Sequence, residues 1–491
     1  MIKTNAIAVL LSAGLFGGCA TVPREAGFGD VQKAVAERTG HLVQWRGRSA
    51  EDAAVDQLVR SLLQKELTAE DAVEIAVLNN LSLQATYQDL GIAQADLVQA
   101  GLLQNPTLSL ERRFSGQAAE FDVAQNLISL LAMPLRKRVA GAQFEAAKRR
   151  VGHAVLETAA ETREAFYYCQ AAEQSLEMRR SVAEATASSA DAAKRLHDAG
   201  NTNDLDLANE QKLAGQARLD LSTAENDAVQ ARERLTMQMG VWGPATTWKI
   251  APRLPEVPAS DPPQQGLETL AISRRLDLEA GRQEIIATAQ SLGLTQAFRY
   301  IPEITVFNHY SHEIDPVHSI GPGVQFTVPL FDQGQAQMFK GQAMLEQSQL
   351  RYAALAVNIR SKVRAAYGAM AHSRAKAEYY RREVLPLQQK ILDQTQLQFN
   401  GMFFGVFRLL DAKQAQINAG REYIEALRDY WVGHAELERM TGGRLTGSAA
   451  GNVSGGPVPD MNSPKMDMKD TPEMKDMDIK GMEHKNMPGM K

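Results

Sequence analysis

The segment Pro329-Leu330-Phe331-Asp332-Gln333-Gly334 separates two contrasting sequence patterns. Before it, Val324, Phe326 and Val328 alternate with polar residues, and this period of two is typical of a β-strand. After it, residues 335 to about 398 are rich in Ala, Gln, Glu, Arg and Leu and almost free of Gly and Pro, which predicts one long helix. At the usual rise per residue that helix would span roughly 90 Å. The chain therefore joins a strand to a helical rod.

The same order of patterns occurs twice in the chain. Four pairs of segments correspond at a nearly constant spacing: Leu81–Ala85 and Leu276–Ala280, Pro106–Ser109 and Pro302–Thr305, Pro134-Leu135 and Pro329-Leu330, Gly200 and Gly401. A repeat of this length indicates a duplicated structural unit. The sequence predicts a mainly α fold with a small β part, built from two helix–strand–strand–helix–helix repeats.

The repeats set the expected domain boundaries. These are 1–19 (lipoprotein-type signal peptide), 20–66 (N-terminal arm with a helix around Val55–Leu67), 67–240 (first repeat), 241–264 (proline-rich linker), 265–442 (second repeat) and 443–491 (disordered methionine-rich tail). In the first repeat we expect a helix from Thr68, its N-cap, to about Leu103. Alternating runs over 107–114 and 121–135 follow, with Pro134 ending the second, and then a helix from Lys137 to about His197.

The last helix of each repeat carries an apolar stripe with the spacing of a coiled coil. The stripes are Ala217, Leu221, Ala224, Ala228, Ala231 and Leu235 in the first repeat, and Ile417, Gly420, Ile424, Leu427 and Trp431 in the second. Such narrow stripes need neighbouring helices on both flanks, so we expect packing between repeats and between chains.

Composition excludes some classes of protein. The 491 residues have a net charge of −5, with charges of both signs mixed along the helices, so the chain lacks the basic surface of a nucleic-acid-binding protein. Cys19 and Cys169 are the only cysteines. Because Cys19 lies in the leader, we expect no internal disulfide in the mature chain.

The first twenty residues predict export. Lys3 is followed by the apolar stretch Ala6–Phe16 and by the small residues around Cys19. This arrangement resembles a bacterial lipoprotein signal, in which Cys19 becomes the lipid-bearing N-terminus. Phe16 departs from that pattern, which prefers Leu, Val or Ile there. The alternative is ordinary signal cleavage after Ala20. Beyond the leader no run of eighteen apolar residues occurs, so the sequence offers no transmembrane helix.

Two strand pairs are too few for an independent β structure. Four strands leave unpaired edges, and small membrane barrels begin at about eight strands. The strands should therefore close with those of other copies of the chain.

With these features in place, the chain resembles the outer-membrane factor family of TolC-like channels over about residues 55–442. The segments that carry the resemblance are Leu81-Ser82-Leu83, Asn105-Pro106, Arg275–Leu278, Val328–Gly334 and Leu410-Asp411-Ala412. The resemblance implies a homotrimer with a twelve-stranded outer-membrane β-barrel that continues into a long α-helical periplasmic barrel. It also implies docking to a periplasmic adaptor and to an inner-membrane pump, for which the resistance-nodulation-division type is expected.

The resemblance also implies a gate at the periplasmic tip, formed by the turns at 200–206 and 401–411. Family members narrow this entrance with acidic rings in the pattern Asp-x-Leu-Asp-Ala, which here reads Arg408-Leu409-Leu410-Asp411-Ala412. Three Asp411 carboxylates in a ring would favour cations. Arg408 would either pair with Asp411 or offset its field, and Asp204 and Asp206 would contribute to the same rim. The alternative is that all of these are solvated charges at helix ends.

The tail from Gly451 has the composition of a disordered segment, yet it is rich in methionine. Soft thioether ligands suit Cu(I) and, by the same softness, Ag(I), and methionine has no packing role in such a tail. The candidate ligands are Met461, Met466, Met468, Met474, Met477, Met482, His484, Met487 and Met490. The alternative is that the methionines arose by drift in a low-complexity tail and bind no metal. A second, weaker candidate is the group His309, His312 and His318 with Glu313 and Asp315, for which a solvated loop is the favoured interpretation.

These features favour an outer-membrane efflux channel for heavy-metal ions, with copper or silver as cargo, and not an enzyme. The channel requires no cofactor, although the tail would bind Cu(I) or Ag(I). A channel for drugs or for type I protein secretion, with an incidental tail, is the main alternative. A purely structural coiled coil of the envelope is disfavoured because the strand pairs recur at matched positions.

Overall fold

The structure is a computed structural model that describes residues 21–23, 25, 27–47, 50–113, 118–301, 303–312 and 318–445. The N-terminal part comprises α2 (Phe28–Thr39), α3 (Ala50–Gln64), β1 (Glu66–Leu67), α4 (Ala69–Asn79), α5 (Leu81–Ala100), β2 (Thr107–Arg113), β3 (Ala118–Asn126), α6 (Leu127–Asp198) and α7 (Asp204–Met239). A 3-10 turn (Gly243–Thr246) and β4 (Lys249–Ile250) lead to α8 (Leu267–Arg274), α9 (Leu276–Phe298), β5 (Ile304–His312), β6 (His318–Phe326), α10 (Gln335–Tyr379), a π-turn (Tyr380–Val384), α11 (Leu385–Asn400) and α12 (Val406–Thr441).

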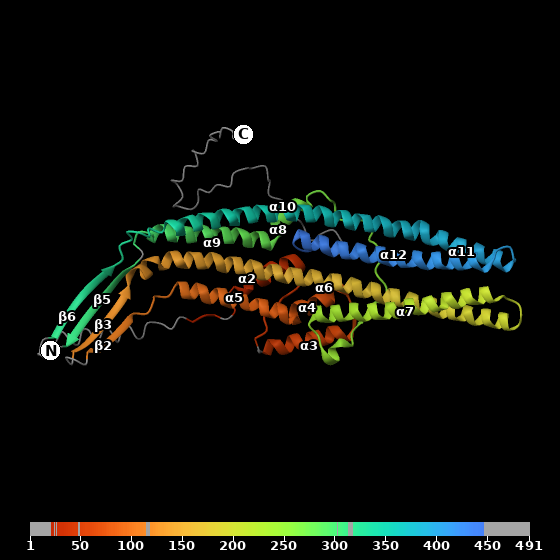
Figure 1. The fold of residues 1–491 in the computed structure, drawn as a ribbon, viewed down its shortest axis with the longest axis horizontal. Coiled ribbons are helices and arrows are strands. Elements are labelled where there is room, and N and C mark those ends of the chain that lie inside the picture. Colours follow the sequence, from red (N-terminus) through yellow and green to blue (C-terminus); the bar gives the residue numbers. More distant parts are fainter. Residues whose placement is uncertain are drawn as a thin grey trace, which may run out of the picture. The chain divides into compact units, whose positions relative to one another are not determined.

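The predicted duplication and the predicted fold class are confirmed. Each half runs through a short helix, a longer helix, two strands, a very long helical segment and a returning helix. The long helices extend from the sheet at one end to the turns before α7 and α12 at the other (Figure 1). None of the described helices combines the length and the hydrophobicity needed to span a membrane.

The two strand pairs form one antiparallel sheet in the order β2-β3-β5-β6. Its register gives two chemically different faces, because successive side chains alternate across a strand. One row across the sheet is apolar and aromatic: Leu110, Phe121, Tyr310 and Ile320. The adjacent row, on the other face, is polar: Ser109, Asp122, His309 and Gly321. Several large apolar side chains of the first face are exposed, among them Leu110 and Ile320.

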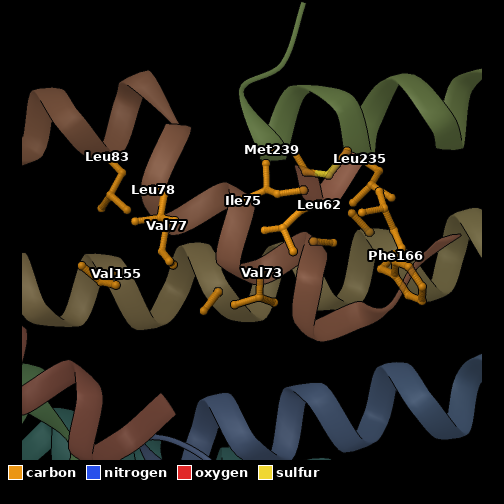
Figure 2. Close-up of a cluster of buried hydrophobic side chains, with 14 of the residues drawn as sticks. Leu62, Val73, Ile75, Val77, Leu78, Leu83, Val155, Phe166, Leu235 and Met239 are labelled. Atoms are coloured by element: carbon orange, nitrogen blue, oxygen red, sulfur yellow. The ribbon is translucent and has the colours of Figure 1, made fainter. Parts of the chain in front are cut away.

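Small residues let the long helices pack closely. In α7 the predicted stripe is buried at Ala217, Ala224, Ala228 and Leu235, and α7 packs along α6. In α12, Ile424 and Leu427 are buried. Where α3, α4 and the end of α7 meet α6, larger side chains form a compact apolar core (Figure 2). The two coiled-coil predictions are therefore confirmed at the buried positions.

A buried ionic network ties the two repeats together. Arg163 of α6 donates to Glu438 of α12 at 2.7 Å and to Glu70 of α4 at 2.9 Å. Burial alone would raise the pKa of Glu70, but the hydrogen bond from His41 and the charges of Arg163 and Arg444 lower it to about 2. The contact joins the N-terminal arm, the first repeat and the C-terminal end of the second.

The prediction of one helix from Thr68 to about Leu103 is wrong. Thr68 and Asp71 do form the capping box, but the helix ends at Asn79 because Asn80 takes an extended conformation and caps the N-terminus of α5. Asn80 Nδ2 also donates to Gln238 O at the end of α7. Arg275, between α8 and α9, does the same in the second repeat by donating to Arg439 O at the end of α12.

The prediction that Pro134 ends a strand is also wrong. The strand ends at Asn126, whose side chain accepts from the Ser129 N–H and starts α6. Pro134 lies inside α6, and the Arg136 guanidinium donates to Ser129 O about two turns earlier. Its sequence counterpart Pro329 lies outside any helix, in the connection 327–334 between β6 and α10.

Three further elements differ from the expectation. The arm contains α2 in addition to α3, and the α2 residue Phe28 packs on Trp45 and Tyr87. The linker pairs back onto the arm, since β4 is parallel to β1. The predicted rod 335–398 is interrupted by the π-turn that precedes Pro386.

Gly240 provides a test of this architecture. It ends α7 with φ +66°, and a Cβ there would lie 2.8 Å from Asn79 O. We expect Gly240→Ala to destabilise the chain by roughly 2 kcal/mol, from left-handed strain and this clash, as a lower Tm of the solubilised protein. Gly215→Ala, in open space within α7, is the control and should be neutral or slightly stabilising. A wild-type Tm for Gly240→Ala would contradict the close approach.

Candidate functional site

The first hairpin turn is a polar tip held by side-chain hydrogen bonds. The turn 199–203 joins α6 to α7. Asn203 accepts from the Asp206 N–H at 2.8 Å and donates to the Asp206 carboxylate at 2.9 Å. Asp204, with a side chain 97% exposed, lies with Oδ1 2.7 Å from His197 Nε2. Asp204 and Asp206 thus lie in the first turn of α7, directly after this tip, and each has a local partner.

The His197–Asp204 contact makes this tip sensitive to pH. The hydrogen bond to Asp204 raises the pKa of His197 above its usual value, and Asp198 adds to the effect. Since the folded-state pKa lies above the unfolded one, the contact stabilises the tip fully below the unfolded pKa of about 6.5. The stabilisation is lost as pH rises through the folded pKa. His197 was not foreseen, although its place in the last turn before the Gly-Asn-Thr-Asn turn is a usable signal.

The second hairpin turn is apolar. Gly401–Gly405 joins α11 to α12, and the side chains of Met402 and Phe403 within it are 93% and 78% exposed. Met402 has φ +61°. The two tips are thus different in chemistry although they occupy corresponding places in the two repeats.

The predicted gate residues Arg408 and Asp411 follow this second tip. The Arg408 guanidinium carbon lies 4.6 Å from the Phe404 ring centroid. Leu409 and Ala412 are buried, while Asp411 is exposed. Within the described part of the chain, no ion pair joins Arg408 to Asp411. Arg408 therefore stacks on its own turn and leaves the Asp411 carboxylate in solvent.

The polar face of the sheet brings one predicted histidine to a carboxylate that was not predicted. His309 Nδ1 lies 2.5 Å from Asp122 Oδ1, and the two residues are direct cross-strand partners on β5 and β3. The period-two pattern of both strands would have revealed the pair once the register was known. The side chains of His312 and His318, as well as Glu313 and Asp315, lie outside the described residues. Among the residues that are described, no group of three or more His, Cys, Asp or Glu side chains forms a metal site.

Two other predicted sites lie outside the described residues. These are the lipid anchor Cys19 and the tail ligands from Met461 to Met490. Both therefore remain predictions from the sequence.

Comparisons with known proteins agree on one class. No protein-family model matches the sequence. The cobalt-zinc-cadmium resistance protein CzcC of Cupriavidus metallidurans is 23% identical over 392 residues, which cover 77% of this chain and 90% of that protein. The structure of CusC, described with transmembrane channel formation, matches with a TM-score of 0.65 and 15% identity, covering 77% of this chain and 92% of CusC. The Campylobacter jejuni CmeC outer membrane channel matches with a TM-score of 0.67 and 12% identity, covering 87% and 93%.

The chain thus has the fold of these channel proteins. The resemblance to the outer-membrane factor family that the sequence predicts is confirmed by the CzcC relative and by the solved channel structures.

The tip contact yields a direct prediction. Histidine hydrogen–deuterium exchange followed by mass spectrometry should give His197 a pKa above the free value, and Asp204→Asn should bring it back down. Asp206→Asn is the matched control, because Asp206 bonds Asn203 instead of His197, and it should leave the His197 pKa raised. An unchanged His197 pKa in Asp204→Asn would show that Asp204 is not its partner.

Proposed function

We propose that this chain is the outer-membrane channel of a tripartite efflux system that exports heavy-metal ions, with copper or silver as cargo. The main observation that supports a channel is the sheet. It has one exposed apolar face and one polar face, and it continues into two long helical hairpins. Alternation of this kind is the pattern of a strand between lipid and a polar lumen. The channel needs no cofactor.

Three copies are proposed to close the sheet. In the described chain β2 and β6 are the edge strands of a four-stranded sheet. An open edge leaves backbone N–H and C=O groups unpaired, which a hydrocarbon environment does not tolerate. Three chains supply twelve strands and remove every edge, and the helical hairpins of the three chains then surround a common tunnel.

Partners and location follow from the channel. A periplasmic adaptor and an inner-membrane pump, of the resistance-nodulation-division type, would supply cargo and energy. Cys19 would carry the lipid that anchors the chain in the outer membrane. Incorporation of radioactive palmitate that is lost in Cys19→Ser but kept in Cys169→Ser is the measurement for this anchor.

Asp411 is the proposed charge at the entrance. Its carboxylate is exposed, and Arg408 is held on Phe404, so three copies would present three uncompensated carboxylates to the lumen. Such a ring raises the local concentration of cations. Asp204 and Asp206 would add to the rim, weakened by the neighbouring His197 when it is protonated.

The choice of cargo rests on two unequal observations. The tail residues Met461 to Met490 favour soft monovalent ions, whereas the relative CzcC is named for cobalt, zinc and cadmium. The thioether argument concerns this chain's own residues, so copper or silver is proposed. Drug efflux or protein secretion with an incidental tail is the alternative.

Tolerance assays test the function. We expect a strain that lacks the chain to lose tolerance to copper and silver, the full chain to restore it, and the chain without residues 452–491 to restore it only in part. Asp411→Asn should also restore tolerance only in part.

A matched tail variant isolates the sulfur atoms in the same assay. Replacing the tail methionines by leucine keeps length and hydrophobicity but removes the thioethers, and it should behave like the deletion. Full tolerance with the leucine tail would show that the tail thioethers do not contribute to metal export. Loss of tolerance to antibiotics alone, in the strain without the chain, would contradict metal export.

A further inference from the structure

A band of exposed apolar side chains surrounds the place where the strands meet the long helices. We call it the junction belt: Leu130, Leu131, Tyr300, Val328, Leu330 and Phe331. Their exposed fractions range from 46% for Leu130 to 93% for Phe331. The belt continues the apolar face of the sheet, because Phe326 at the end of β6 is also exposed. Val328, Leu330 and Phe331 line one groove, and soluble monomers rarely expose a large apolar patch, so the belt marks a contact surface.

A groove of about 620 Å³ is cut into this belt. Its walls are the first turns of α6, the end of α9 and the connection 327–334, with Ala132, Phe298 and Leu330 among the lining residues. Gly334, with φ +74°, lets the connection approach α9 so closely that a Cβ there would lie 3.1 Å from Arg299 Cβ. The groove is therefore a fixed feature of the backbone, and its size is in the range of small-molecule sites.

Arg299 and Lys137 are two of the cations at this belt; Arg136, which donates to Ser129 O, is another. Arg299 lines the groove, and its guanidinium carbon lies 4.2 Å from the Tyr300 ring centroid. Lys137 is exposed on α6, two residues after the predominantly apolar stretch Leu127–Leu135. Over the residues that the structure describes, neither side chain forms an ion pair or a hydrogen bond. Nine helical residues span about 13 Å, so Lys137 lies at the far edge of an apolar layer that begins at the sheet.

We propose that the junction belt binds a glycerophospholipid, with an acyl chain in the groove and the headgroup phosphate on Arg299, and with Lys137 holding headgroups on the first-repeat side. The inference rests on the proposed location in the outer membrane and names the inner leaflet as the source of the lipid. An apolar layer, an aromatic ring and then basic side chains follow one another as acyl chains, interface and phosphates do in a leaflet. Long basic side chains reach headgroups from such a position.

A second copy of the chain is the competing occupant. It would have to bring carboxylates to Arg299 and Lys137. Asp332, the acid that lines the same groove, is instead used inside the turn, where its Oδ1 accepts from the Gly334 N–H at 2.9 Å. Charge complementarity therefore favours an anionic headgroup.

The test is the affinity of the purified full-length chain in detergent for phosphatidylglycerol, measured by native mass spectrometry. Arg299→Gln and Lys137→Gln should each weaken binding about fivefold, and the double variant roughly twentyfold, from the usual contribution of one basic residue near an anionic surface. Lys362→Gln, an exposed position on α10 distant from the belt in sequence, is the matched control and should change affinity less than about twofold.

Each other outcome overturns the proposal. Unchanged affinity in the double variant removes the two cations from lipid binding. If the double variant loses its oligomeric state but keeps its affinity for lipid, the belt contacts a second copy of the chain and not a lipid. Tighter binding of lipid A than of phosphatidylglycerol contradicts the inner leaflet, and equal competition by soluble glycerol phosphate contradicts the acyl groove. Metal tolerance is measured separately, so a failure of the efflux function leaves the lipid measurement interpretable.

Discussion

The open edges of the β2-β3-β5-β6 sheet are the constraint on which the proposed assembly depends. Each edge carries a row of backbone donors and acceptors, and the apolar face beside it excludes water as a partner for them. In the part of the chain that the structure describes, no further strand pairs with either edge, because the other two strands, β1 and β4, pair with each other. In the proposed assembly, closure with other copies would pair these backbone groups and at the same time place the polar row with Asp122 and His309 inside. A lumen would thus follow from satisfying the backbone.

In each repeat, a side-chain hydrogen bond at the helix ends fixes the returning helix relative to the first two helices. Asn80 and Arg275 differ in chemistry, yet each lies in an extended break between two helices and donates to carbonyls at the end of its own repeat's last helix. The glycines that follow those last helices, Gly240 and Gly442, both have positive φ and approach the break closely. The returning hairpin is therefore fastened at its base, while its tip is free to differ between repeats.

Sequence periodicity was sufficient for the duplicated plan, the strands and the helical seams, since each leaves a regular pattern of apolar residues. It failed where one side chain outweighs the local pattern. The sequence around Asn80 predicts a continuous helix. The break at Asn80 is held by its hydrogen bond to the carbonyl of Gln238, which is distant in sequence. Pro134 suggests a boundary, but Asn126 had already started the helix. The sequence predicts the chain reversal at 200–206, but the contact of His197 with Asp204 depends on where their side chains lie on the two helix ends, which periodicity does not give.

The two junctions between sheet and helix show what the duplication preserves. In the first repeat, α6 starts directly after β3, and its first two turns supply Leu127, Leu130 and Leu131. In the second repeat, an irregular connection supplies Val328, Leu330 and Phe331 before α10 begins. The backbones differ, yet both place large exposed apolar side chains directly after the sheet. Under the proposed lipid contact, such a position needs only apolar side chains, so its backbone conformation is free to change. A contact with a single protein partner would have required one shape.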